Sequence, residues 1–113
     1  MRITHIAMAG ALLFGCASVP TPTERMEASA AAIRSAEEVG AQKVPGAAYH
    51  LQLAKEQQQF AKEKLAKKEK SQAKWLLIRA QSDAELALAL AREEQGRSQA
   101  QKATEKFKEL DNQ

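Results

Sequence analysis

Apolar side chains recur every three or four residues along most of the chain, which is the spacing of one face of an α-helix. This pattern predicts helices at residues 24–39, 46–68 and 71–95, and a tail helix at residues 97–110 whose stripe has a different orientation. The stretch "GAQKVPG" at residues 40–46 holds two glycines and a proline and predicts a break. The predicted fold class is therefore all-α.

The second and third stripes step alternately by four and three residues, the period of a coiled coil. Because only a few polar residues join these two helices, we expect an antiparallel helical hairpin, with the N-terminal helix as an additional third layer. The stripe residues are Met26, Ala30, Ile33 and Ala36 or Val39 in the first helix, Ala47, Leu51, Ala54, Gln58, Ala61 and Leu65 in the second (widened by Leu53 and Phe60), and Ala73, Leu77, Ala80, Ala84, Ala87 and Ala91 in the third.

Residues with strong positional preferences mark the helix ends. Thr21 or Thr23 can cap the start of the first helix, and Gly40 is suited to follow its last residue. Pro45 fits the first turn of the second helix. Gly96 costs about 1 kcal/mol inside a helix relative to alanine, so we expect a break or kink there. Whether the tail helix then faces the first helix or another subunit stays open, and its stripe is Ala100, Ala103, Phe107 and Leu110.

The first residues follow a different pattern. Residues 6–14 form an apolar run without charge, preceded by Arg2. A membrane-spanning helix needs roughly 20 residues, so the run is too short to span a bilayer, but it has the length of a signal-peptide core. The run leads into Cys16, the only cysteine, which excludes an internal disulfide and argues against a thiolate zinc site.

Residues 13–16, "LFGC", resemble the lipobox of bacterial lipoprotein precursors, in which a leucine and two small residues precede the cysteine. Leu13, Gly15 and Cys16 match this motif, and Phe14 stands where the family usually has a small residue. Two other interpretations of the cysteine stay open. One is an ordinary buried cysteine of a cytosolic protein, and the other is a secretory signal without lipid.

The lipobox resemblance implies cleavage between Gly15 and Cys16, so that residues 1–15 are a signal peptide. It also implies that Cys16 carries the lipid anchor, and that residues 16–23 tether the helices to a membrane. In this family an aspartate after the cysteine signals retention in the inner membrane. Ala17 stands there instead, which implies the outer membrane, facing the periplasm.

Residues 31–91 resemble a small all-helical domain of unknown function found in bacterial lipoproteins. The resemblance lies in "AAIRSAEEVGAQKVPGAAYHLQLAKEQ" at residues 31–57 and "AKWLLIRAQSDAELALALA" at residues 73–91. Members of that family often lie beside or within proteins that bear an OmpA-like peptidoglycan-binding domain. The family has no established function, so the resemblance implies no functional residue beyond the lipobox cysteine.

The lysines around the predicted hairpin turn are the most concentrated charge in the chain. The overall net charge of +3 is mild, and no arginine or aromatic residue interleaves these lysines, so we expect no nucleic acid partner. One interpretation is a patch for anionic lipid headgroups, lipopolysaccharide or an acidic partner. The other is a solvated turn supported by a Glu63–Lys67 pair. The patch residues are Lys64, Lys67, Lys68, Lys70 and Lys74.

Four further side chains are of types that can carry chemistry or binding. Trp75 is a candidate partner contact, the alternative being that it covers the end of a small core. His50 has no ligand-type neighbour at helical spacing and is predicted to be a surface histidine. Asp83 is predicted to pair with Arg79 within the third helix, and Glu93 with Arg97. We therefore expect no catalytic residue, no cofactor, no metal and no small-molecule substrate.

These observations predict a lipid-anchored periplasmic helical protein with a structural or protein-interaction role in the cell envelope. Its partners would be the membrane, through the anchor, and an envelope protein or a second copy of the chain. One alternative is a small oligomeric coiled-coil envelope lipoprotein. Another is a soluble helical adaptor or chaperone.

Overall fold

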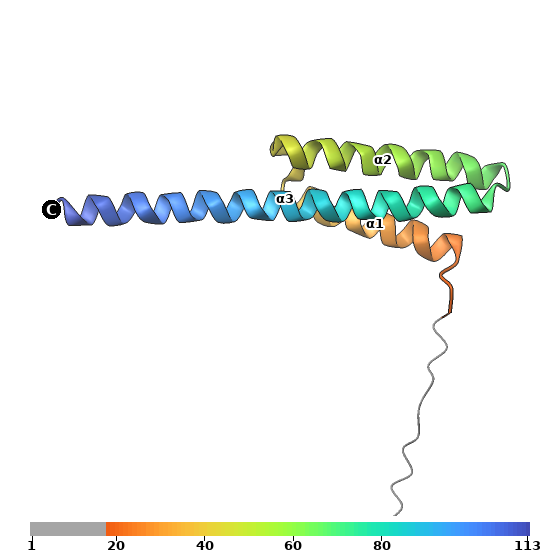
Figure 1. The fold of residues 1–113 in the computed structure, drawn as a ribbon, viewed down its shortest axis with the longest axis horizontal. Coiled ribbons are helices and arrows are strands. Elements are labelled where there is room, and N and C mark those ends of the chain that lie inside the picture. The colour runs from red at the N-terminus through yellow and green to blue at the C-terminus, as the bar shows by residue number, and fades with distance from the viewer. Residues whose placement is uncertain (1–17) are drawn as a thin grey trace, which may run out of the picture.

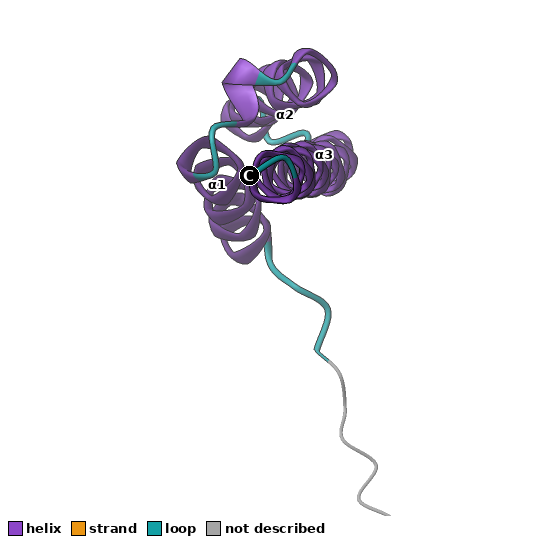
Figure 2. Ribbon diagram, turned by 90° about the vertical axis from the view of Figure 1, so that its left-hand side faces the viewer, coloured by secondary structure: helices purple, strands orange, loops and turns teal. Residues whose placement is uncertain are grey.

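A computed structural model, which describes residues 18–113, contains three α-helices and one short 3-10 helix (Figure 1). In chain order they are α1 (Pro22–Glu38), η1 (Ala41–Lys43), α2 (Pro45–Ala66) and α3 (Lys70–Asp111). α2 and α3 form an antiparallel hairpin, and α1 lies against it, running in the same direction as α3 (Figures 1 and 2). The predicted all-α fold, a helical hairpin with an additional N-terminal helix, is confirmed.

α1 begins at Pro22, two residues earlier than predicted, because Thr21 and Glu24 form a reciprocal cap. The Thr21 hydroxyl accepts a hydrogen bond from the Glu24 backbone N–H at 3.2 Å, and the Glu24 carboxylate accepts one from the Thr21 backbone N–H at 2.6 Å. The bond from the Thr21 backbone N–H is the main reason why the pKa of Glu24 lies below its ordinary value.

The predicted break between the first two helices is present. Gly40 has a φ of 80°, in the left-handed region that favours glycine, and it stops α1 directly after Val39. η1 then reverses the chain, and Pro45 takes up the first position of α2, where its missing N–H removes no helical hydrogen bond.

Alanine side chains form most of the contact between the helices. The stripe predicted for the third helix is buried in full in α3. In α1, Ser29 is buried where Ala30 was predicted, and Ala30 is half-buried. The buried apolar residues are Ile33, Ala36, Ala41, Ala47, Leu51, Ala54, Ala61, Ala73, Leu77, Ala80, Ala84, Ala87 and Ala91.

The stripe of α2 differs from the prediction at two places, and one of them is its last residue, Leu65, which is half-buried. Gln57 is buried, whereas Gln58 is half-buried. The reason is that α2 touches both other helices, with Gln57 hydrogen-bonded to α3 and Gln58 to α1. Phe60 was expected to widen the buried face of this helix, but its side chain is half-exposed, on the surface beside α3.

α3 runs without interruption through Gly96, so the expected break and the separate tail helix are wrong (Figure 1). The glycine is flanked by strong helix formers, and Arg97 reaches back across it to Glu93 at 2.7 Å and Glu94 at 3.5 Å. The Glu93–Arg97 pair is thus confirmed. A helix already formed by packing also extends at a small cost per residue, because nucleation is the unfavourable step.

The tail of α3 does not pack on α1. Its last link to that part of the fold is the Gln95 side-chain amide, which donates to the Val39 carbonyl at 2.8 Å. Beyond it α3 continues for 16 residues, about 24 Å at 1.5 Å per residue, with Phe107 73% and Leu110 58% exposed. Of the two alternatives for this segment, contact with the first helix is therefore wrong.

The turn between α2 and α3 is a Schellman motif. The Glu69 backbone N–H donates to the Lys64 carbonyl at 2.9 Å, and the Lys68 N–H donates to the Leu65 carbonyl at 3.0 Å. Lys68 occupies the left-handed position of this motif, with a φ of 61°, where glycine is the usual residue. The expected Glu63–Lys67 pair is replaced by Lys64, whose ammonium donates to the Glu69 carboxylate across the turn at 2.9 Å.

Because the β-carbon of Lys68 is strained at this φ, we expect Lys68→Gly to raise the free energy of unfolding by roughly 1 kcal/mol. The matched control is Lys68→Ala, which removes the same charge and keeps the β-carbon, so it should leave the stability within about 0.5 kcal/mol of the parent chain. Urea unfolding followed by circular dichroism measures both. Equal stabilities of the two variants would contradict the backbone explanation.

Candidate functional site

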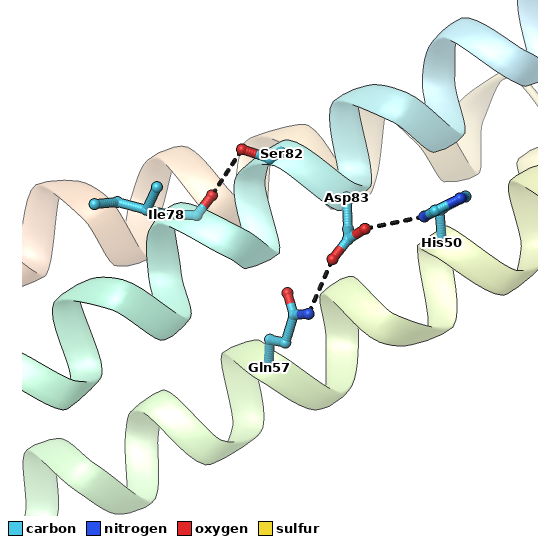
Figure 3. A network of polar contacts seen from close by, with 5 residues as sticks. All are labelled: His50, Gln57, Ile78, Ser82 and Asp83. Carbon is cyan, nitrogen blue, oxygen red and sulfur yellow. Dashed lines mark hydrogen bonds and ion pairs between the residues drawn. The ribbon is translucent and has the colours of Figure 1, made fainter.

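A polar cluster joins α2 to α3 near the middle of the hairpin (Figure 3). The Asp83 carboxylate of α3 accepts a hydrogen bond from the Gln57 amide at 2.9 Å and lies 2.9 Å from the Nδ1 atom of His50. Both partners of Asp83 come from α2, where they are seven residues, or about two helical turns, apart. The expected Arg79–Asp83 pair is wrong, because Asp83 bridges to the neighbouring helix, and His50 is half-buried beside it rather than fully exposed.

A second polar pair continues this layer toward α1. The Gln58 amide of α2 donates to the Ser29 hydroxyl of α1 at 3.0 Å, and that hydroxyl donates to the Met26 carbonyl at 2.9 Å. The polar layer separates two apolar clusters. One surrounds Leu51 and extends to Ala91, and the other surrounds Leu77 beside the hairpin turn.

The polar cluster is suited to fixing the alignment of the helices. Both Asp83 oxygens are engaged by groups of α2, which leaves this carboxylate bound on both sides. Within residues 18–113 no group of three histidine, cysteine or carboxylate side chains lies close enough to hold a metal ion. Because the two contacts of Asp83 lie at different positions along α2, they fix the axial position of α2 relative to α3.

The predicted lysine patch lies around the α2–α3 turn, at the end of the molecule opposite the free end of α3 (Figure 1). Lys67, Lys68 and Lys70 are exposed there, and no ion pair engages them within the described residues. Lys64 is bound to Glu69, and its hydrogen bond is the main cause that lowers the pKa of the Glu69 carboxyl. The patch is thus centred on the turn itself.

Trp75 lies on the side of the hairpin next to these lysines, with 60% of its surface exposed. The Lys74 ammonium lies 5.4 Å from the centre of its ring, within the range of a cation–π interaction. Trp75, Phe60 and Leu76 line an open apolar groove between α2 and α3. The sequence allows two roles for Trp75, contact with a partner or covering the end of a small core. Its exposed side chain is available for contact with a partner.

The N-terminal part of the chain reaches the fold at this same end. Pro20 and Pro22 lie beside Lys70 and Lys74, together with Arg25 from the first turn of α1. The lipobox residues Gly15 and Cys16, and the predicted signal peptide before them, lie outside the described residues. The start of α1 and the basic turn therefore form one end of the bundle, which we call the basic end.

None of the helices between Pro22 and Asp111 is both long and apolar enough to cross a membrane.

We expect Asp83→Ala to lower the free energy of unfolding by about 1–3 kcal/mol, because it leaves the buried Gln57 amide and the half-buried His50 without their partner. Glu85→Ala is the matched control: it removes the same charge from an exposed site two residues away and should change the stability by about 0.5 kcal/mol or less. Urea unfolding of both variants measures the difference. Equal losses would show that Asp83 has no special role between the helices.

Comparison with known proteins assigns the chain to no family. No family model matches it, and no curated protein and no solved structure matches it either. Its function therefore has to be argued from the residues and their geometry.

Proposed function

We propose that the chain is a lipid-anchored periplasmic protein of a bacterial cell envelope, with a structural or protein-interaction role. The observation that carries this proposal is the apolar run at residues 6–14, which is followed by Gly15 and Cys16. A short proline-containing stretch and the first helix come directly after the cysteine. Two or more acyl chains on Cys16 would hold the protein stably on a membrane. The resemblance of residues 31–91 to a helical domain of bacterial lipoproteins supports the same location.

The shape of the described helices suits a spacer or an interaction scaffold. The chain enters the fold at the basic end, and α3 carries its C-terminal residues past the last contact with the other helices. A 42-residue helix is about 63 Å long at 1.5 Å per residue. An anchor at one end would therefore present the free segment of α3 well away from the membrane surface.

The lipid anchor is tested by labelling cells that express the full chain with radioactive palmitate. We expect a labelled membrane protein whose label disappears in Cys16→Ser. The control combines Cys16→Ser with Ser18→Cys, which keeps one cysteine but places it outside the lipobox, and we expect no label there either. An unlabelled, full-length product in the soluble fraction would contradict the anchor and favour the soluble adaptor.

A second candidate role is self-association through the free segment of α3. An isolated helix of about 15 residues is only marginally stable in water, and this segment exposes an apolar stripe that a second copy could cover. The segment carries four basic and three acidic side chains over residues 97–111, so two copies would not repel one another strongly. Its stripe is Ala100, Ala103, Phe107 and Leu110.

Sedimentation equilibrium of residues 17–113 tests this role. These residues include the caps of α1 and both apolar clusters, and circular dichroism checks that each variant is helical. We expect the average mass to rise with concentration and to fall to that of the monomer in Phe107→Glu. The control Leu86→Glu alters an exposed leucine of α3 within the bundle and should leave association unchanged. A monomer at every accessible concentration would contradict self-association.

A further inference from the structure

We propose that the basic end of the bundle binds the anionic phospholipid headgroups of the membrane, with Trp75 seated at the interface, so that α3 is directed away from the bilayer. The inference rests on the proposed lipid anchor for the attachment of the chain, but the contact itself involves other residues. It assigns a ligand class, phospholipid phosphate in a bilayer, to the lysines of the turn.

The charge distribution is the first argument. The first turns of α1 and residues 62–74 carry seven basic and four acidic side chains, whereas the rest of residues 18–113 carries nine basic and ten acidic ones. All the net positive charge of the described chain is thus at one end. Anionic lipids attract basic residues near the surface, and this attraction declines within a Debye length, about 8 Å at physiological salt.

The path of the chain brings this end to a membrane. Cys16 lies five residues before Thr21, and an extended chain spans at most about 3.6 Å per residue, so the cap of α1 stays within about 18 Å of the lipidated residue. Pro20 and Pro22 lie beside Lys70 and Lys74 at the start of α3. The tether therefore keeps the basic end close enough to the anchor for its lysines to reach the headgroups.

The aromatic side chains of the basic end are the second argument. Trp75 is five residues from the start of α3, about 8 Å along the helix axis, and Phe60 faces it across the apolar groove. Tryptophan favours the interface between headgroups and acyl chains, and lysines extend their charged ends toward phosphates from such a position. The hairpin would therefore incline toward the bilayer on the side of this groove.

The backbone of Lys68 agrees with this assignment. The turn position at φ 61° is better suited to glycine, yet it holds a lysine in the middle of the patch. The lysine therefore adds a positive charge to the centre of the patch at some cost in backbone stability. Lys68→Gly should therefore stabilise the fold and weaken the lipid contact at the same time, as happens where stability and function conflict.

The single tryptophan makes the contact directly measurable. The lipidated protein is reconstituted into vesicles of phosphatidylethanolamine and phosphatidylglycerol that carry brominated acyl chains. We expect the Trp75 emission to shift to shorter wavelength and to be quenched. An unquenched emission at the wavelength of water-exposed tryptophan, from protein whose lipidation is verified by mass, would overturn the proposal and leave the anchor intact.

The lysines are tested with unlipidated residues 17–113, so that the anchor plays no part in the outcome. Partition onto the same vesicles at low salt should fall roughly tenfold or more when Lys67, Lys68 and Lys70 are all changed to Gln, and should also fall at high salt. The matched control changes Lys102, Lys106 and Lys108 to Gln, an equal loss of charge at the free end, and should bind like the parent chain. Equal losses in both variants, or binding to neutral phosphatidylcholine vesicles of the same strength, would overturn the proposal.

Discussion

The close approach of α2 and α3 over a seam of alanines is the constraint on which the rest of the structure depends. Ten of the thirteen buried apolar residues are alanine, which buries little area per side chain, so the packing energy is distributed along the whole length of the hairpin. A seam of similar side chains repeating every seven residues would fit almost as well after a shift of one repeat. The Asp83 contacts to His50 and Gln57, and the single large Leu77 in the second cluster, are what distinguish one alignment from the others.

The sequence predicts this fold well where the information is local. Periodicity identifies every buried residue of the α3 stripe, and Gly40 and Pro45 mark the break because each meets a local backbone requirement. Contacts between helices depend on alignment, which no single helix encodes. The alignment that places Ala47 opposite Ala91 also places Asp83 opposite the stretch between His50 and Gln57, so the polar cluster could have been found by asking which α2 residues face each α3 carboxylate. The break predicted at Gly96 is wrong for another reason. The intrinsic cost of about 1 kcal/mol for this glycine is real, but a helix that is already nucleated continues through it without breaking.

The two ends of the bundle have opposite characters. At the basic end the start of α1 meets the α2–α3 turn. The Schellman motif and the Lys64–Glu69 ion pair close this turn, and the exposed lysines and Trp75 lie around it. At the other end the bundle closes with η1 and the Gln95–Val39 hydrogen bond, and α3 continues alone. This polarity follows from helix length, since α1 has 17 residues and α2 has 22, whereas α3 has 42. The candidate contact residues could be named from the sequence, but their gathering at the end where the chain enters could not, because it depends on α1 running parallel to α3.

The direction of the free segment of α3, residues 96–111, is set by the packing of the earlier part of α3 against α1 and α2. Beyond Gln95 no side chain of α3 is held by α1 or α2 in the described structure, so the segment is a continuation of a helix whose axis is fixed by the alanine seam. A helix transmits such a direction over several turns because each added residue is locked by its own backbone hydrogen bond. A change in the alignment of α2 on α3 would therefore move the free end through a distance larger than the change itself. The Asp83 cluster, although far from both ends, thus controls how the surface at one end is oriented relative to the basic residues at the other.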